Sequence, residues 1–124
     1  MQPQIEACYR LLPKVSRTFA LNIRILPGDL RPAVTAAYLL FRYADTIEDA
    51  PGLGPDDRSE LFEAFLDRLD GKRPLRLPDA ARTLLVESIP PEENDLLIHG
   101  EAVFQVLESL SPEVREIIGS HVAE

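Results

Sequence analysis

The feature that most constrains this chain is a largely apolar segment, residues 36–50 (AAYLLFRYADTIEDA), that ends in the three carboxylates Asp45, Glu48 and Asp49. Side chains three and four residues apart share one side of a helix, so these three can face the same way. Acids at a helix C-terminus meet the negative end of the helix dipole and repel one another. A bound cation would relieve both effects. The pattern predicts a site for Mg²⁺ and a diphosphate, because Mg²⁺ takes carboxylate oxygens and is commonly completed by substrate phosphates.

The acidic cluster alone is more typical of a solvated helix end than of a metal site. The residues before it favour a site, because Tyr38, Arg42, Asp45 and Asp49 follow at spacings of four, three and four and form one helical stripe. Arg42 is the one basic side chain in the segment, where an unpaired charge would be costly. Two interpretations of Arg42 stay open. It forms an ion pair with Asp45 or Glu48, or it faces a polar cavity and binds an anion.

The composition indicates one globular domain, residues 1–124, with 45% hydrophobic and 27% charged residues. A net charge of −8 argues against nucleic-acid binding. No apolar run is long enough to span a membrane and no signal peptide opens the chain. We therefore expect a cytoplasmic protein, either free or peripheral to the membrane. The single cysteine, Cys8, excludes an internal disulfide, and we expect it to be a small buried hydrophobe.

Helical periodicity without strand alternation predicts an all-α fold. Pro13 is expected to interrupt the first helix, and Ser16 and Asp29 to cap the second and third. The apolar interior of the third helix predicts burial on most sides. We expect the acidic pair Glu92-Glu93 at the surface. His99 is expected either at the surface or in the core with its hydrogen bonds satisfied. The expected helices are 5–12, 17–25, 30–48, 57–69, 79–88, 96–110 and 113–124.

Residues 15–49 (VSRTFALNIRILPGDLRPAVTAAYLLFRYADTIED) resemble the N-terminal signature of the squalene/phytoene synthase family. The matching elements are S-R-[ST]-F at 16–19 and Y-L-x-x-R-x-x-D-x-x-E-D at 38–49. Each motif alone is weak, but the two together at this separation are specific. Residues 99–124 resemble the continuation of the family less specifically.

The resemblance implies the N-terminal helices of the isoprenoid synthase fold. It also implies a prenyltransferase that joins two prenyl diphosphates head to head through a cyclopropylcarbinyl diphosphate. The substrates would be farnesyl diphosphate, giving squalene, or geranylgeranyl diphosphate, giving phytoene. The implied cofactor is Mg²⁺, with NADPH in addition if squalene is the product. The motifs do not decide between squalene and phytoene as the product, and they do not determine the chain length of the substrate.

By the same resemblance, Asp45 and Asp49 would be metal ligands and Glu48 a third acid. Arg42 would contact the diphosphate. Together with Tyr38, the residues Arg42, Asp45 and Asp49 would form the catalytic set. The metal and the arginine would neutralise charge on the leaving diphosphate.

The earlier motif would add substrate contacts. Ser16 and Arg17 match the diphosphate-contacting segment, and Phe19 and Tyr38 match positions near the isoprenoid and the reacting centre. In squalene-forming members, Arg17 and Arg42 would also lie near the nicotinamide. Each residue has a structural alternative: a helix N-cap for Ser16, a surface position for Arg17, and core packing for Phe19 and Tyr38.

The chain departs from the family pattern in one respect. Family members are much longer and carry a second aspartate-rich motif that closes the metal site, and residues 95–124 contain none. The resemblance therefore covers an N-terminal portion, which we expect to be truncated and inactive alone in condensation. We expect such a piece to pair with a missing C-terminal part or another polypeptide, or to self-associate. The alternative is a non-catalytic helical fragment that binds Mg²⁺ and diphosphate weakly or acts only through protein contacts.

Overall fold

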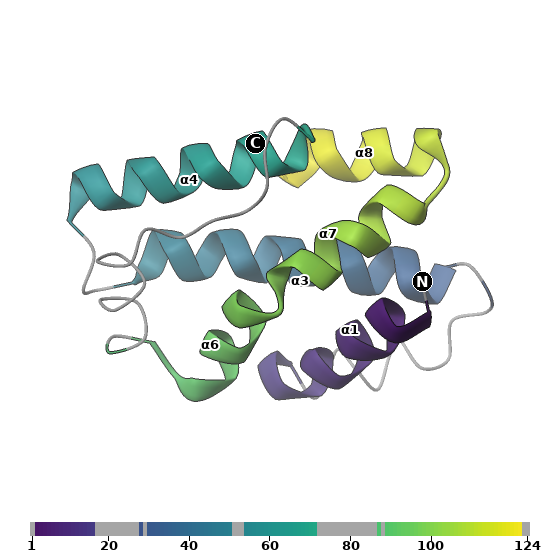
Figure 1. Cartoon of the computed structure of the whole chain (residues 1–124), viewed down its shortest axis with the longest axis horizontal. Helices are drawn as coiled ribbons and strands as arrows, with labels where there is room; N and C mark the ends of the chain where they lie inside the picture. Colours follow the sequence, from purple (N-terminus) through teal and green to yellow (C-terminus); the bar gives the residue numbers. More distant parts are fainter. Residues whose placement is uncertain are drawn as a thin grey trace.

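The computed structural model describes residues 2–16, 28, 30–50, 54–71, 87 and 89–122. Every secondary-structure element in these residues is a helix, which confirms the expected all-α class. The helix expected at 17–25 and nearly all of the helix expected at 79–88 lie outside the described residues. The helices are α1 (Gln2–Val15), α3 (Leu30–Asp49), α4 (Pro55–Leu69), α6 (Pro91–Ile98), α7 (Gly100–Ser109) and α8 (Pro112–Val122) (Figure 1).

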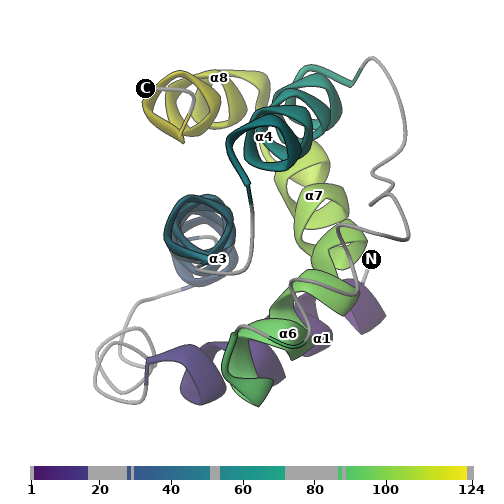
Figure 2. The ribbon, with the colours of Figure 1, turned by 90° about the vertical axis from the view of Figure 1, so that its left-hand side faces the viewer.

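The central element is α3, which packs against α1, α4, α6, α7 and α8. Figure 2 looks along α3 and shows these helices arranged around part of its circumference. Leu39, Leu40 and Ile47 are fully buried, and burial of such a side chain contributes about 1.5–3 kcal/mol. The buried hydroxyl of Thr46 donates a hydrogen bond to the backbone carbonyl of Arg42 at 2.8 Å, so it carries no unpaired polar group into the core.

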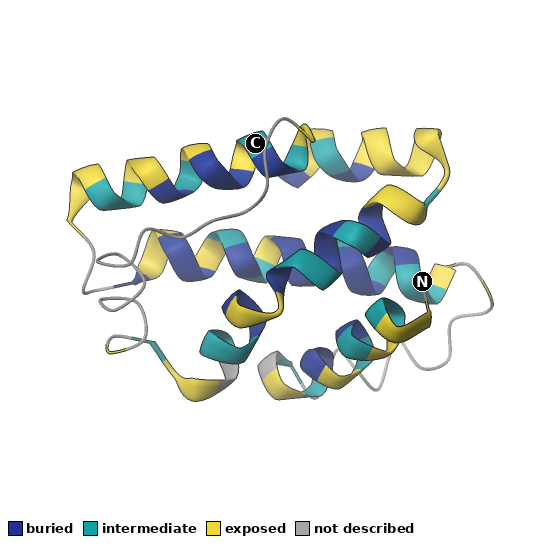
Figure 3. Ribbon diagram, in the orientation of Figure 1, coloured by how far each residue is buried: buried dark blue, intermediate teal, exposed yellow. Residues whose placement is uncertain are grey.

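One side of α3 faces away from the other helices. Phe41 is 42% exposed and Leu30 is 53% exposed, and the two lie about three turns apart on the same side. Figure 3 shows exposed and buried residues alternating along this helix. The expectation that α3 is buried on most sides does not extend to this side, whereas Leu39, Leu40 and Ile47 are fully buried. Apolar composition does not tell which sides of a helix its neighbours cover.

Three aromatic side chains join α3, α4 and α7 at the centre of the core. The ring of Tyr43 stacks on Phe65 with centroids 5.5 Å apart and meets the edge of Phe104 at 6.3 Å. Phe65 and Phe104 complete the set edge to face at 5.5 Å. Offset-stacked and edge-to-face pairs are the favourable aromatic geometries. The guanidinium of Arg68 covers the outer face of Phe104, 4.9 Å from its centroid.

The first helix is longer than the sequence predicted. α1 spans Gln2–Val15 and continues through Pro13, so the expected interruption at this proline is wrong. The backbone N–H of Ser16 donates to the carbonyl of Leu12 at 2.8 Å, which is a helical hydrogen bond formed across the proline. Because Pro13 lies in the last turn of α1, its missing N–H removes one bond near the end of the helix and does not break it.

The predicted helix 96–110 is wrong as a single element. It is two helices, α6 and α7, and α6 begins earlier than predicted, at Pro91. His99 separates them with φ −99° and ψ 16°, and Gly100 opens α7 (Figure 1). Glycine lowers helix propensity, and proline is well suited to the first turn of a helix. These two effects explain both the break and the early start.

The other predicted boundaries agree with the structure. α3 ends at Asp49, α4 begins at Pro55, and α8 begins at Pro112. The hydroxyl of Ser111 accepts a hydrogen bond from the N–H of Val114 at 3.4 Å, as expected of a helix N-cap. In the part of the chain that the structure describes, no helix combines the length and apolarity needed to cross a lipid bilayer.

Candidate functional site

The C-terminal end of α3 forms one wall of a pocket of about 130 Å³. The first turn of α6 and the two residues before it form the opposite wall. α3 contributes Arg42, Asp45, Thr46, Asp49 and Ala50, and the α6 side contributes Ile89, Pro90 and Glu93.

The α3 residues of this wall follow helical spacing. Arg42, Asp45, Thr46 and Asp49 are three, one and three positions apart, so they lie on one side of the helix. Thr46 is buried, Arg42 is half-buried, and Asp45 and Asp49 are exposed. The wall therefore runs from the protein interior at Thr46 to the solvent, where both carboxylates lie.

Arg42 forms an ion pair across the pocket. Its Nη2 atom donates to Oε1 of Glu93 on α6 at 2.7 Å, and the two side chains are 30% and 22% exposed. Among the described residues, no ion pair joins Arg42 to Asp45 or Glu48, so the interpretation that it pairs within its own helix is wrong. Its buried Nε atom has no hydrogen-bond partner in this part of the chain. Arg42 lines the polar pocket, as the second interpretation expects, and its binding of an anion stays a prediction.

A second arginine stabilises the same end of α3. Arg58 of α4 donates from Nε to the carbonyl oxygen of Ile47 at 3.3 Å and from Nη2 to that of Ala50 at 2.9 Å. α3 has no basic residue in its own last turn. Arg58 therefore supplies positive charge at the negative end of the α3 dipole. Part of the compensation that the sequence assigned to a metal comes from this side chain.

The carboxylates in the pocket are suited to a Mg²⁺ ion that takes only a few of its ligands from the protein. Asp45 and Asp49 line one pocket from one side of one helix. Within the described residues, no three His, Cys, Asp or Glu side chains are grouped so as to hold a metal ion by themselves. Mg²⁺ commonly uses only one or two carboxylates and completes its octahedron with waters and substrate phosphates. Two aspartates beside an arginine are compatible with that coordination.

The other predicted site residues are placed differently. Glu48 is exposed and does not line the pocket, so its role as a third acid stays a prediction. Tyr38 is half-buried and packs against the core, one turn before Arg42. Ser16 is half-buried and directly follows α1. Arg17 and Phe19 lie outside the described residues. The structure thus brings together Arg42, Asp45 and Asp49 from the predicted set.

Sequence reasoning missed Glu93 and Arg58. The acidic pair containing Glu93 was expected to be solvated, and that is wrong for Glu93, whose carboxylate is half-buried against Arg42. The two residues are 51 positions apart, so no local pattern connects them. Arg58 lies in the first turn of α4, where a basic residue opposes the dipole of its own helix. That mismatch is the one sequence signal that Arg58 interacts with a helix other than its own.

A larger pocket, of about 340 Å³, lies elsewhere, between α1 and the turn at His99. It contains none of the predicted site residues; Ala7, Arg10, Leu11, Lys14 and His99 line it. His99 is exposed, in agreement with the sequence interpretation, and His121 is exposed as well. Cys8 is 1% exposed, and burial raises the pKa of its thiol to about 12, as expected for a structural residue.

Comparison with known proteins places the chain in a family. The model of the squalene/phytoene synthase family matches residues 12–124. Among curated relatives, the squalene synthase LSS of Botryococcus braunii is 37% identical over 89 residues, which are 71% of this chain and 19% of that protein. The squalene synthase of Eremothecium gossypii is 30% identical over 122 residues, 93% of this chain and 24% of the relative. The lycopaoctaene synthase of Botryococcus braunii is 34% identical over 70 residues, 56% of this chain and 16% of the relative.

The chain spans between 16% and 24% of the length of these three relatives. No solved structure matches it. The family model covers most of the chain, including both motifs and the pocket at the end of α3. The chain belongs to the squalene/phytoene synthase family.

Proposed function

We propose that this chain is part of a prenyltransferase that joins two prenyl diphosphates head to head, and that the pocket at the end of α3 binds the Mg²⁺-complexed diphosphate of one substrate. The observation that supports the proposal most directly is that Arg42, Asp45 and Asp49 line one pocket. Membership of the squalene/phytoene synthase family supplies the reaction class.

In this proposal, Asp45 and Asp49 offer carboxylate oxygens to Mg²⁺. The bound metal neutralises charge on the departing diphosphate and acts as a Lewis acid. Arg42 donates hydrogen bonds to a diphosphate oxygen, since a guanidinium makes strong charge-assisted bonds to phosphate. The buried hydroxyl of Thr46 is bonded to the α3 backbone, which fixes the floor between the charged residues.

The pocket is of a size for a diphosphate headgroup and is too small for a whole prenyl diphosphate. Its volume of about 130 Å³ exceeds the ~30 Å³ share of one water molecule in the liquid, but a prenyl chain does not fit. The isoprenoid tail therefore extends beyond this pocket. Tyr38 and Phe19 are the residues that we propose lie near it. Ser16 and Arg17 are proposed as further diphosphate contacts. Contact with a membrane surface stays a prediction.

A non-catalytic module is the second candidate. The chain covers at most 24% of the three relatives above, and the expected second aspartate-rich motif is absent from residues 95–124. A helical piece that binds Mg²⁺-diphosphate weakly without condensing two substrates is compatible with both facts. Binding and turnover therefore have to be measured separately.

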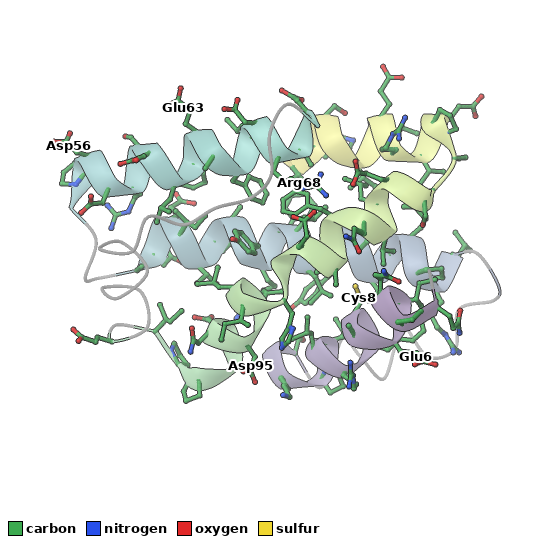
Figure 4. The ribbon with its side chains drawn as sticks, in the orientation of Figure 1. Glu6, Cys8, Asp56, Glu63, Arg68 and Asp95 are labelled. Carbon is green, nitrogen blue, oxygen red and sulfur yellow. The ribbon has the colours of Figure 1, made fainter. Side chains whose placement is uncertain are left out.

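The binding experiment is a calorimetric titration of the 124-residue chain with inorganic pyrophosphate in the presence of Mg²⁺. Asp45→Asn and Asp49→Asn are each expected to weaken binding by about tenfold or more, the effect of losing ~1.4 kcal/mol of interaction. Glu63→Gln is the matched control, because Glu63 is exposed on α4 and points away from α3 (Figure 4). Equal binding by all four proteins would refute the site.

The turnover experiment offers farnesyl and geranylgeranyl diphosphate to the same chain, with and without NADPH. Binding without turnover is expected of the isolated chain. Condensation would show that no second aspartate-rich motif is needed, and the preferred substrate would identify the branch. An increase in squalene on addition of NADPH would identify the reductant.

A further inference from the structure

Among the described residues that line the pocket, Glu93 is the one carboxylate that does not come from α3. It is bonded to Arg42 at 2.7 Å, and both side chains are half-buried. Within the described ranges, no ion pair occupies Asp45 or Asp49. The pocket therefore leaves its two candidate metal ligands available, while the charge of the guanidinium that would bind an anion is already neutralised through Nη2 by Glu93.

The charges of the pocket favour a cation first. In the part of the chain that the structure describes, one guanidinium and three carboxylates line it, which leaves a formal charge of −2. A free diphosphate meets this negative field and also finds Arg42 neutralised by Glu93. A divalent cation held by Asp45 and Asp49 cancels the formal charge of the pocket. Only then is exchange of the Glu93 carboxylate for a diphosphate oxygen on Arg42 favourable.

The exchange requires only a side-chain movement. α6 is anchored by Leu96 and Leu97, which are 0% and 6% exposed, and by the ion pair of Asp95 with Lys14 of α1 at 2.9 Å. Glu93 lies in the first turn of α6, and its side chain is 22% exposed. A rotation about its side-chain bonds therefore carries the carboxylate into water while the helix stays in place.

We propose that Glu93 determines the specificity of this pocket: by occupying the guanidinium of Arg42, it makes diphosphate binding conditional on a divalent cation. The inference rests on the proposed diphosphate site and adds a selection against free anions. A pocket without Glu93 would have lower negative charge and an unoccupied guanidinium, and it would accept diphosphate without the metal.

The test is a calorimetric titration of the chain with inorganic pyrophosphate, with EDTA and with Mg²⁺, for the wild type, Glu93→Gln and Asp95→Asn. The wild type is expected to bind pyrophosphate only with Mg²⁺. Glu93→Gln is expected to bind metal-free pyrophosphate roughly tenfold more tightly than the wild type, because removal of a half-buried ion pair is worth about one power of ten.

Asp95→Asn is the matched control. It removes the same charge from the same helix, on which Figure 4 labels Asp95. The partner of Asp95 is Lys14, and Asp95 does not line the pocket. We expect Asp95→Asn to change pyrophosphate affinity by less than twofold. Glu93→Asp keeps the charge and withdraws the carboxylate, so it is expected to act in the same direction as Glu93→Gln with a smaller effect. It replaces Glu93→Gln if circular dichroism shows that the latter is unfolded.

Two outcomes would overturn the inference alone. In the first, pyrophosphate binding requires Mg²⁺ and Asp45, but Glu93→Gln binds pyrophosphate with the same affinity as the wild type, both with EDTA and with Mg²⁺. The other is a tenfold loss of Mg²⁺ affinity in Glu93→Gln without pyrophosphate, which would make Glu93 a metal ligand. Absence of binding by the wild type and by Glu93→Gln with Mg²⁺ would refute the proposed site together with the inference.

Discussion

The guanidinium of Arg68 on α4 holds both carboxylate oxygens of Glu101 on α7, with Nε at 3.1 and 3.0 Å and Nη2 at 2.6 Å. The same Nη2 also donates to Glu108 at 2.8 Å. Hydrogen bonding to Glu101 raises the pKa of Arg68 above its ordinary value, so the side chain stays charged. Arg68 therefore joins α4 to the first and last turns of α7 and covers the aromatic core.

Replacement of Arg68 by methionine is expected to lower the free energy of unfolding by about 2 kcal/mol. Hydrogen bonds between charged groups are worth more than neutral ones, but Glu101 and Glu108 are 46% and 48% exposed, and water screens part of the interaction. Urea denaturation followed by circular dichroism measures the change. Arg115→Met on the exposed side of α8 is the control and should alter stability by less than ~0.5 kcal/mol. Equal effects of the two substitutions would contradict the assigned role.

Arg58→Met is expected to destabilise the fold by about 1 kcal/mol, because the carbonyls of Ile47 and Ala50 lose a cationic donor at the end of α3. It should also weaken Mg²⁺-pyrophosphate binding less than Asp45→Asn does, since Arg58 does not line the pocket. Urea denaturation and the calorimetric titration measure the two effects. A larger binding loss for Arg58→Met than for Asp45→Asn would place Arg58 in the site itself.

The buried thiol of Cys8 is expected to make the protein less stable at high pH. Burial raises its pKa from the ordinary value of 9.0 to about 12. The stabilising effect of the protonated thiol is fully present below pH 9 and is lost as the pH rises toward 12, because the unfolded chain releases the proton first. The free energy of unfolding should fall by up to ~1.4 kcal/mol per pH unit in this window from this group.

Cys8→Ala should show a shallower decline above pH 9 than the wild type, measured by urea denaturation at a series of pH values. Tyr43 is retained in both proteins, and its pKa is also raised by burial, so the difference between the curves isolates the thiol. At pH 8, a thiol reagent should modify the native protein much more slowly than the urea-unfolded chain. Rapid modification of the native protein would mean that Cys8 is accessible.

The sequence was a good guide where the information is local. The helical spacing of residues 42–49 placed Arg42, Asp45 and Asp49 on one side of one helix, and the structure has them lining one pocket. The cap before α8 is likewise local, because a serine followed by proline specifies a helix start through local hydrogen bonding. The predicted interruption at Pro13 failed because a proline in a last turn costs too little to end a helix.

The sequence by itself determined the all-α class, the family motifs and the order of charges along α3, since these depend on periodicity and on neighbours three or four residues apart. Only the tertiary structure decided that Glu93 pairs with Arg42, that Arg58 caps α3, and that Arg68 binds Glu101. These contacts join different helices across 51, 8 and 33 positions. Their free energy depends on which helix faces pack together, and packing is a property of the folded chain that no local pattern contains.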